Sequence, residues 1–202
     1  MQPFDVIVIG DGVGGLSCAM TLASAHVKRW WDDRRVLLIG DGRSDLEKAR
    51  LFNAPGISPG TDGTAVLQTM REQLAQYPAA THLTGHVVHI ERCDQAWNVV
   101  TETGDMHSTP ILILATGYKR WEFEGLPVSP APHPRGGKPD RISLQHDGVY
   151  QVSPNLHVAG LLGGGSSQFA IAAGIGAQVA VEILSKWAGK RTHVHDLPER
   201  PE

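Results

Sequence analysis

The stretch VIVIGDGVGGLSCAM, residues 6–20, decides the fold of this chain. It begins with a run of apolar residues, the pattern of a strand that is buried on both faces. The glycines Gly10, Gly12 and Gly15 follow at once, at the spacing G-x-G-x-x-G. In such a loop one glycine permits a tight turn, a second lets the backbone approach a pyrophosphate, and a third lets helix and strand pack closely. The stretch therefore predicts a strand, a phosphate-binding turn and a helix over residues 13–25.

A second apolar run, RVLLI at residues 35–39, completes a β-α-β unit of the dinucleotide-binding type. The alternative is a glycine turn with a purely structural role. An acid at the end of the second strand usually holds the adenosine ribose, but this chain has Gly40 there and Asp41 one position later. Two roles for Asp41 stay open, as a ribose ligand or as a turn residue. Arg43 is either a phosphate contact or a solvated cation.

The rest of the chain continues the alternation of strands and helices. Its pattern predicts an α/β fold with a central parallel sheet and an added β-hairpin or meander. The predicted elements are a loop at 42–63, a helix capped by Asp62 and running to about Tyr77, a strand within 81–92, a hairpin around 103–105, a buried strand leading into 115–117, a surface connection at 119–148, a short strand at 155–160, a helix at 168–184 and a polar tail at 189–202.

Composition narrows the class of protein. The 202 residues carry a formal net charge of −3 and no basic block, which gives nucleic-acid binding no electrostatic support. The apolar runs are shorter than the ~20 residues of a membrane helix, and the start MQPFDVIVIG does not have the pattern of a signal peptide. The two cysteines, Cys18 and Cys93, form no C-x-x-C pair. We therefore expect a cytoplasmic protein in a reducing compartment.

Four stretches in this order resemble the FAD-binding domain of the thioredoxin-reductase-like flavoproteins, within the pyridine nucleotide-disulfide oxidoreductase family. The fourth stretch contains Q-x-x-x-A-A-G-x-G-A-x-x-A from Gln168 to Ala180, which is similar to the flavin helix of that family. The segment LTGHVVHIER is also similar to the strand whose backbone meets the adenine. The four stretches are IGDGVGGLS, NAPGISPGTDGTAVLQTMREQ, LILATG and NLHVAGLLGGGSSQFAIAAGIGAQVA.

The resemblance implies FAD as the cofactor. It places Asn53, Pro55 and Gly56 along the isoalloxazine, Val87 at the adenine, and the positive end of the helix at Gln168 near the flavin N1–O2 edge. The implied cofactor-binding residues are Gly10, Gly12, Val13, Gly14, Gly15, Gly40, Asp41, Arg43, Asn53, Pro55, Val87, Ala115, Thr116, Gly117, Gly160, Leu161, Gln168 and Phe169.

The chain departs from the family at two places. Residues 119–148 form a short connection where family members insert an NAD(P)H domain, so we expect a single FAD-binding domain over 1–188. Leu161 stands where the family has the aspartate of its AGD motif. Losing one hydrogen bond to a large ligand costs about 0.5–1.5 kcal/mol, and we therefore expect FAD binding to persist. A different adenine nucleotide, or an empty degenerate site, is the alternative.

The expected function is that of a flavoprotein oxidoreductase reduced by its substrate, by a partner protein or by free NAD(P)H. A non-catalytic FAD- or adenine-nucleotide-binding subunit or sensor is the alternative. We expect a homodimer or a redox partner protein, and neither nucleic acid nor membrane as partner. The sequence identifies no catalytic acid or base. It predicts no metal site, because the spacing of His86 and His89 places them on opposite faces of one strand.

Overall fold

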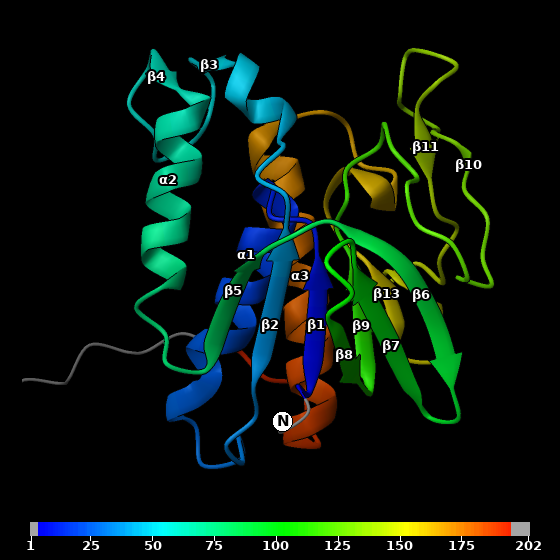
Figure 1. Ribbon diagram of the computed structural model, residues 1–202. Coiled ribbons are helices and arrows are strands. Elements are labelled where there is room, and N and C mark those ends of the chain that lie inside the picture. The colour runs from blue at the N-terminus through cyan, green and yellow to red at the C-terminus, as the bar shows by residue number, and fades with distance from the viewer. Residues whose placement is uncertain (1–3, 195–202) are drawn as a thin grey trace, which may run out of the picture.

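The computed structural model describes residues 4–194, and a six-stranded sheet forms its centre (Figure 1). The strands are β1 (Val6–Ile9), β2 (Val36–Gly40), β5 (Ala80–Thr84), β9 (Ile111–Leu114), β12 (Gln151–Ser153) and β13 (Leu156–Val158). They are ordered β12-β13-β9-β1-β2-β5, and every neighbouring pair is parallel except β12 with β13. The predicted α/β fold with a mainly parallel sheet is confirmed.

Three helices form the layer on one face of this sheet. They are α1 (Val13–Ala23), α2 (Gly63–Leu74) and α3 (Phe169–Ala188), and α1 continues into a 3-10 turn, η1 (Ser24–Val27). In Figure 1, α1 and α3 lie behind β2 and β1, and α2 stands at the β5 edge of the sheet. Glycines let α1 and α3 approach closely, since a Cβ on Gly176 would lie 2.1 Å from the carbonyl oxygen of Gly14. Small residues in both helices thus bring their N-termini to one place.

The opposite face is covered by a three-stranded antiparallel meander. Its strands are β6 (Val87–Cys93), β7 (Ala96–Thr101) and β8 (Met106–Thr109). Alternate residues of β1 serve the two layers: Val6 and Val8 pack with the helices, whereas Ile7 and Ile9 pack with the meander and its fully buried Trp97. This double burial is the reason that β1 is a continuous apolar run.

The structure corrects several of the predicted elements, and it extends the helix predicted at 168–184 to Ala188. The single strand predicted within 81–92 is two strands, because the chain leaves the central sheet at Gly85 and β6 begins a separate sheet at Val87. Helix α2 ends at Leu74 rather than Tyr77. Asp62 occupies its N-cap position but does not cap it, since its carboxylate is 3.0 Å from Nε of Arg50.

Short elements complete the fold. They are η2 (Asp45–Lys48), β3 (Arg50–Leu51), β4 (Thr61–Asp62), β10 (Ala131–Pro132), β11 (Ile142–Ser143) and η3 (Gly160–Gly163). The pair β10–β11 is the regular structure of the 119–148 connection, which lies over one end of the molecule in Figure 1. Most of the predicted polar tail, residues 195–202, lies outside the described residues.

Helix α3 is long and apolar enough to cross a membrane by length and composition. Its buried residues, among them Val179, Ala180 and Ile183, belong to the same core as α1 and the sheet. Packing inside the domain accounts for this buried part of α3, which is 39% of the apolar window.

Candidate functional site

A cavity of about 490 Å³ opens at the carboxyl ends of the parallel strands. Open α/β sheets bind ligands at this edge, and the volume is in the range of ~300–1,000 Å³ usual for small-molecule sites. All the predicted site residues line the cavity except Gly15, Pro55 and Gly56. Gly15 is a packing glycine, since a Cβ there would lie 1.8 Å from the carbonyl oxygen of Gly10, and Pro55 is exposed. The structure thus brings together segments that are far apart in the sequence.

Gly12 differs from the other glycines of this loop. Gly10 has a φ of +104° and lies against Ala115, and a Cβ on Gly14 would be 2.5 Å from Cα of Gly160. Gly12 has a φ of −76°, which any residue adopts, and the nearest atom to its Cβ position is the Ser44 hydroxyl at 3.5 Å. Neither backbone strain nor packing within residues 4–194 requires glycine at position 12. The open space beside its backbone is room for a ligand.

Two helix N-termini meet at this cavity. Gly12 precedes α1 and Gln168 precedes α3, both residues line the cavity, and no side chain in the described chain caps either helix. The Gln168 side chain instead accepts a hydrogen bond from Nδ2 of Asn53 at 3.3 Å. Neither helix has an acidic residue in its first turn. Unpaired N–H groups and the partial positive charge of a helix N-terminus favour a bound anion.

The hydroxyl of Thr116 is a further polar group at this site. Its oxygen is buried and has no hydrogen-bond partner among residues 4–194, and Thr116 lines the cavity. Buried polar atoms are normally paired. A ligand or an ordered water in the cavity would supply the partner.

Asp11, which the sequence predictions did not include, forms a buried corner of the cavity. Its Oδ2 lies 3.3 Å from Nη2 of Arg71 and 3.4 Å from Nε2 of His82, and its Oδ1 accepts a hydrogen bond from the Gly42 amide at 3.2 Å. Burial raises the pKa of the Asp11 carboxyl, but the hydrogen bond from His82 and the charge of Arg71 outweigh burial and bring that pKa below its usual value. Asp11 is therefore a carboxylate at neutral pH. The sequence signal that could have identified Asp11 is an acid inside the glycine-rich loop together with a glycine, Gly40, at the end of the next strand.

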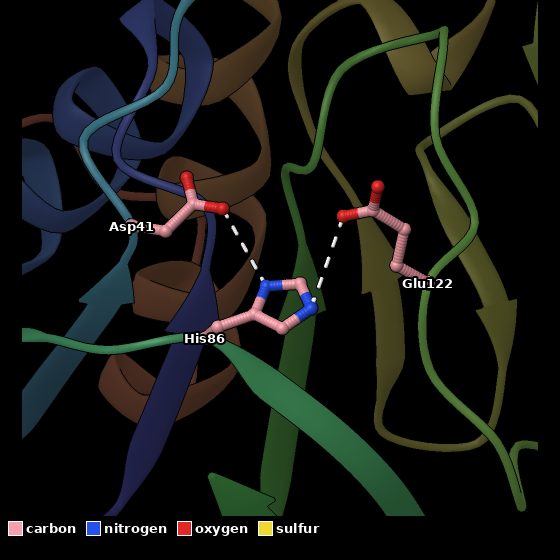
Figure 2. A group of neighbouring side chains, drawn as sticks. All are labelled: Asp41, His86 and Glu122. Atoms are coloured by element: carbon pink, nitrogen blue, oxygen red, sulfur yellow. Dashed lines mark ion pairs between the residues drawn. The ribbon is translucent and has the colours of Figure 1, made fainter. Parts of the chain in front are cut away.

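A second cluster lies at the cavity rim (Figure 2). His86 is 3.5 Å from a carboxylate oxygen of Asp41 and 3.8 Å from one of Glu122. Arg43 forms an ion pair with Asp41, and its Nη2 is 3.1 Å from Glu122 and 3.2 Å from Nδ1 of His86. Burial raises the pKa of the Asp41 carboxyl, but the hydrogen bonds and charge of Arg43 lower it further than burial raises it.

Asp41, His86 and Glu122 offer ligand atoms within 4.8 Å of one another. A cation there would have to displace Arg43, which already contacts all three side chains. Glu122 belongs to the connection, so sequence reasoning did not join it to Asp41. The connection also reaches the loop after β2 through an ion pair of Lys119 with Asp45.

The same connection supports the turn that carries Leu161. His133 Nε2 is 2.9 Å from the Leu161 carbonyl oxygen, and its Nδ1 accepts the Arg135 amide, so the proton lies on Nε2. Arg135 Nη1 donates to the carbonyl of Gly164 at 2.8 Å. His146 lies 3.2 Å from the carbonyl oxygen of Gly163. Three side chains of the connection thus fix η3 and the residue after it against the cavity.

The two cysteines lie on different elements. Cys18 is buried in α1, and burial raises the pKa of its thiol well above the usual value, as expected for an inert core thiol. Cys93 is exposed at the end of β6 and does not line the cavity.

Comparison with known proteins finds similarity to several reductases. No family model matches the chain. A ferredoxin–NADP reductase of Leuconostoc citreum is 25% identical over 193 residues, which are 95% of this chain and 52% of that protein. The chain thus spans about half the length of this curated relative.

Solved structures show the same fold. A thioredoxin reductase from Gloeobacter violaceus matches 99% of this chain and 100% of its own, with a TM-score of 0.76 and 15% identity. An oxidoreductase from Agrobacterium tumefaciens matches 94% and 100%, with a TM-score of 0.75 and 15% identity. A ferredoxin-flavin thioredoxin reductase from Clostridium acetobutylicum matches 93% and 99%, with a TM-score of 0.68 and 14% identity. The predicted likeness to thioredoxin reductases is confirmed at the level of the fold.

Proposed function

We propose that this chain binds FAD in the cavity at the carboxyl edge of its sheet and acts as a flavin-dependent oxidoreductase. The observation that carries the proposal is Gly12, whose missing side chain opens the backbone to a ligand although the protein's own packing does not need it. The uncapped N-termini of α1 and α3 and the unpaired Thr116 hydroxyl are also consistent with bound FAD. The likeness to reductases, one of them named for a flavin, supports FAD over another nucleotide.

The chain's own residues would hold the cofactor by its phosphates and its flavin. Backbone amides beside Gly12 would bind the diphosphate, because they are donors at a positive helix end. FAD, when bound, supplies the redox chemistry, and the protein supplies position and polarity. The start of α3 at Gln168 would favour negative charge on the part of the cofactor nearest to it. Asn53, hydrogen-bonded to Gln168, fixes that side of the cavity.

The electrons that reduce the bound FAD would come from a donor other than the residues that line the cavity. The connection at 119–148 holds one short antiparallel strand pair and braces η3, which supports our inference that it belongs to this domain. We infer a donor that approaches from solution, which is a substrate, a redox partner protein or free NAD(P)H. A partner or a second copy of the chain would cover exposed apolar side chains near the loop of Asn53, such as Phe52, which is 69% exposed.

A second candidate function is a non-catalytic FAD- or adenine-nucleotide-binding subunit. The side chain at position 161 favours it, since Leu161 packs on the apolar core and offers no carboxylate to the ribityl side of a flavin. A module that only binds the adenosine part would not need that carboxylate.

The flavin content of the purified chain, followed by anaerobic mixing with NAD(P)H, tests these functions. We expect about one FAD per chain, identified by absorbance and mass, and loss of the flavin absorbance when a donor is added. FAD that NADH, NADPH and candidate reduced partners all fail to bleach would favour the non-catalytic subunit. A chain that binds ADP but not FAD would contradict the oxidoreductase.

A further inference from the structure

The corner at the end of β2 contains an unusual exchange of residues. The position that normally carries an acid is Gly40, and the acid Asp11 comes instead from the glycine loop after β1. A Cβ on Gly40 would lie 2.3 Å from the carboxyl carbon and from Oδ1 of Asp11, and 2.4 Å from its Cβ. The Asp11 side chain therefore occupies the space into which a side chain at position 40 would project. Glycine at position 40 is a requirement of this arrangement.

Asp11 is held in this place by groups from three further segments. Arg71 of α2 and His82 of β5 contact its Oδ2, and the Gly42 amide binds its Oδ1. The charge of Arg71 compensates the buried carboxylate, which lowers the cost of having an acid beside a phosphate-binding loop. Within residues 4–194, Oδ1 accepts one hydrogen bond. Because a carboxylate oxygen can accept two, Oδ1 retains capacity for a ligand hydroxyl.

Asp41, the other acid nearby, is committed to the rim cluster. Its Oδ1 accepts the backbone amide of Arg43, and its Oδ2 contacts the Arg43 guanidinium and His86. Figure 2 shows its carboxylate turned toward His86 and Glu122. Oδ1 of Asp41, like Oδ1 of Asp11, accepts one hydrogen bond, so the position of the two acids separates them: Asp41 belongs to the rim cluster, whereas Asp11 fills the space beside Gly40 at the end of β2.

We propose that Asp11 binds the adenosine ribose of the dinucleotide, in place of the acid that usually ends the second strand of such folds. This assignment rests on the proposed FAD function. It makes Asp11 a specificity-determining residue for the adenosine half of the ligand, and it makes Asp11 and Gly40 an interdependent pair.

The test compares ADP with 2′,3′-dideoxy-ADP as competitors for the FAD-loaded protein, with flavin fluorescence as the signal. The parent should prefer ADP by about 10- to 150-fold, the range expected for a hydrogen bond to a charged group. Asp11→Gly should abolish most of that preference. Asp11→Asn, which keeps the shape of the side chain, should reduce it and carries the test if Asp11→Gly does not fold.

Moving the carboxylate from position 11 to position 40 gives the most specific test. Gly40→Asp alone should lose FAD binding or stability, because its side chain collides with Asp11. The double variant Asp11→Gly/Gly40→Asp returns one carboxylate to the same corner and should restore the preference for ADP. The melting temperature, measured in parallel, identifies a merely structural effect.

The outcomes distinguish failure of the proposed FAD function from failure of the Asp11 assignment. A parent chain that binds no FAD ends the proposed function and leaves no dinucleotide for Asp11 to recognise. A parent that binds FAD but does not distinguish ADP from the dideoxy compound overturns the assignment of Asp11 alone. Asp11 variants that keep the preference while Asp41→Asn abolishes it would assign the ribose to Asp41 instead.

Discussion

The substitution Gly12→Ala separates the requirements of the ligand from those of the fold. The added Cβ would have the Ser44 hydroxyl at 3.5 Å as its nearest neighbour, an ordinary van der Waals contact, and a φ of −76° suits alanine. Alanine is a poorer N-cap than glycine by several tenths of a kcal/mol or more, and the stiffer unfolded chain offsets about 0.4–1 kcal/mol of this. The free energy of unfolding should therefore change by less than about 1 kcal/mol.

The effect of Gly12→Ala on FAD binding should be larger. A methyl group placed where the diphosphate lies overfills a close-packed contact, and such overpacking costs about 1–3 kcal/mol. This range corresponds to a loss of affinity of about 5- to 150-fold. Gly12→Val adds two more methyl groups in the same direction and should abolish binding.

Titration of the flavin-free protein with FAD gives the affinity, and thermal unfolding without ligand gives the stability. Gly174→Ala is a matched control: Gly174 is exposed in α3, and a Cβ there has no heavy atom within 4 Å. It should stabilise the chain by up to about 1 kcal/mol and leave FAD affinity unchanged. A Gly12→Val variant with the affinity of the parent would refute the placement of the phosphates. A Gly12→Ala variant that unfolds readily would refute the claim that packing leaves this position free.

Three other predictions concern the site and the core. Leu161→Asp should tighten FAD binding by about 2- to 10-fold, the worth of one restored hydrogen bond; no gain in the same titration would mean that the cofactor lies differently from the family pattern. Gly14→Ala should lower the free energy of unfolding by about 1–3 kcal/mol, because its Cβ would lie 2.5 Å from Cα of Gly160; an unchanged melting temperature would contradict the close approach of α1 to that turn. Burial and, to a smaller extent, the charge of Lys186 lower the pKa of His157 from 6.5 to about 4. As the pH falls, the unfolded chain therefore binds a proton before the folded chain does, and the free energy of unfolding decreases between pH 6.5 and pH 4. The complete loss of stability is about 3 kcal/mol, and urea unfolding at pH 7 and pH 4.5 samples part of it. The His157→Leu variant should lose less stability between these two pH values than the parent. Equal pH dependence in both proteins would contradict the prediction.

The sequence was sufficient to predict the β-α-β core because its signals are local. Apolar runs and glycine spacing within residues 6–40 fix which side chains are buried and where the turn lies. The break at Gly85 was missed, since the residues on both sides alternate like one strand and only pairing with β2 or β7 separates them. Tertiary pairing is not encoded in a short window of sequence.

Long-range polar contacts of the site were beyond local reasoning. Glu122 and His133 lie in a Pro- and Gly-rich connection, and nothing near them in the sequence indicates their partners on the β2 loop and on η3. Asp11 is different, because it stands inside the motif itself. Its role follows only when the space above Gly40 is known.

Calorimetric titration of the flavin-free chain with FAD tests the central claim most directly, because the claim is that backbone amides beside Gly12 form a dinucleotide site. We predict saturable binding of one FAD per chain, with Gly12→Val removing it in a variant that still unfolds cooperatively. Absence of binding to the folded parent chain, or equal binding by both proteins, would contradict this account.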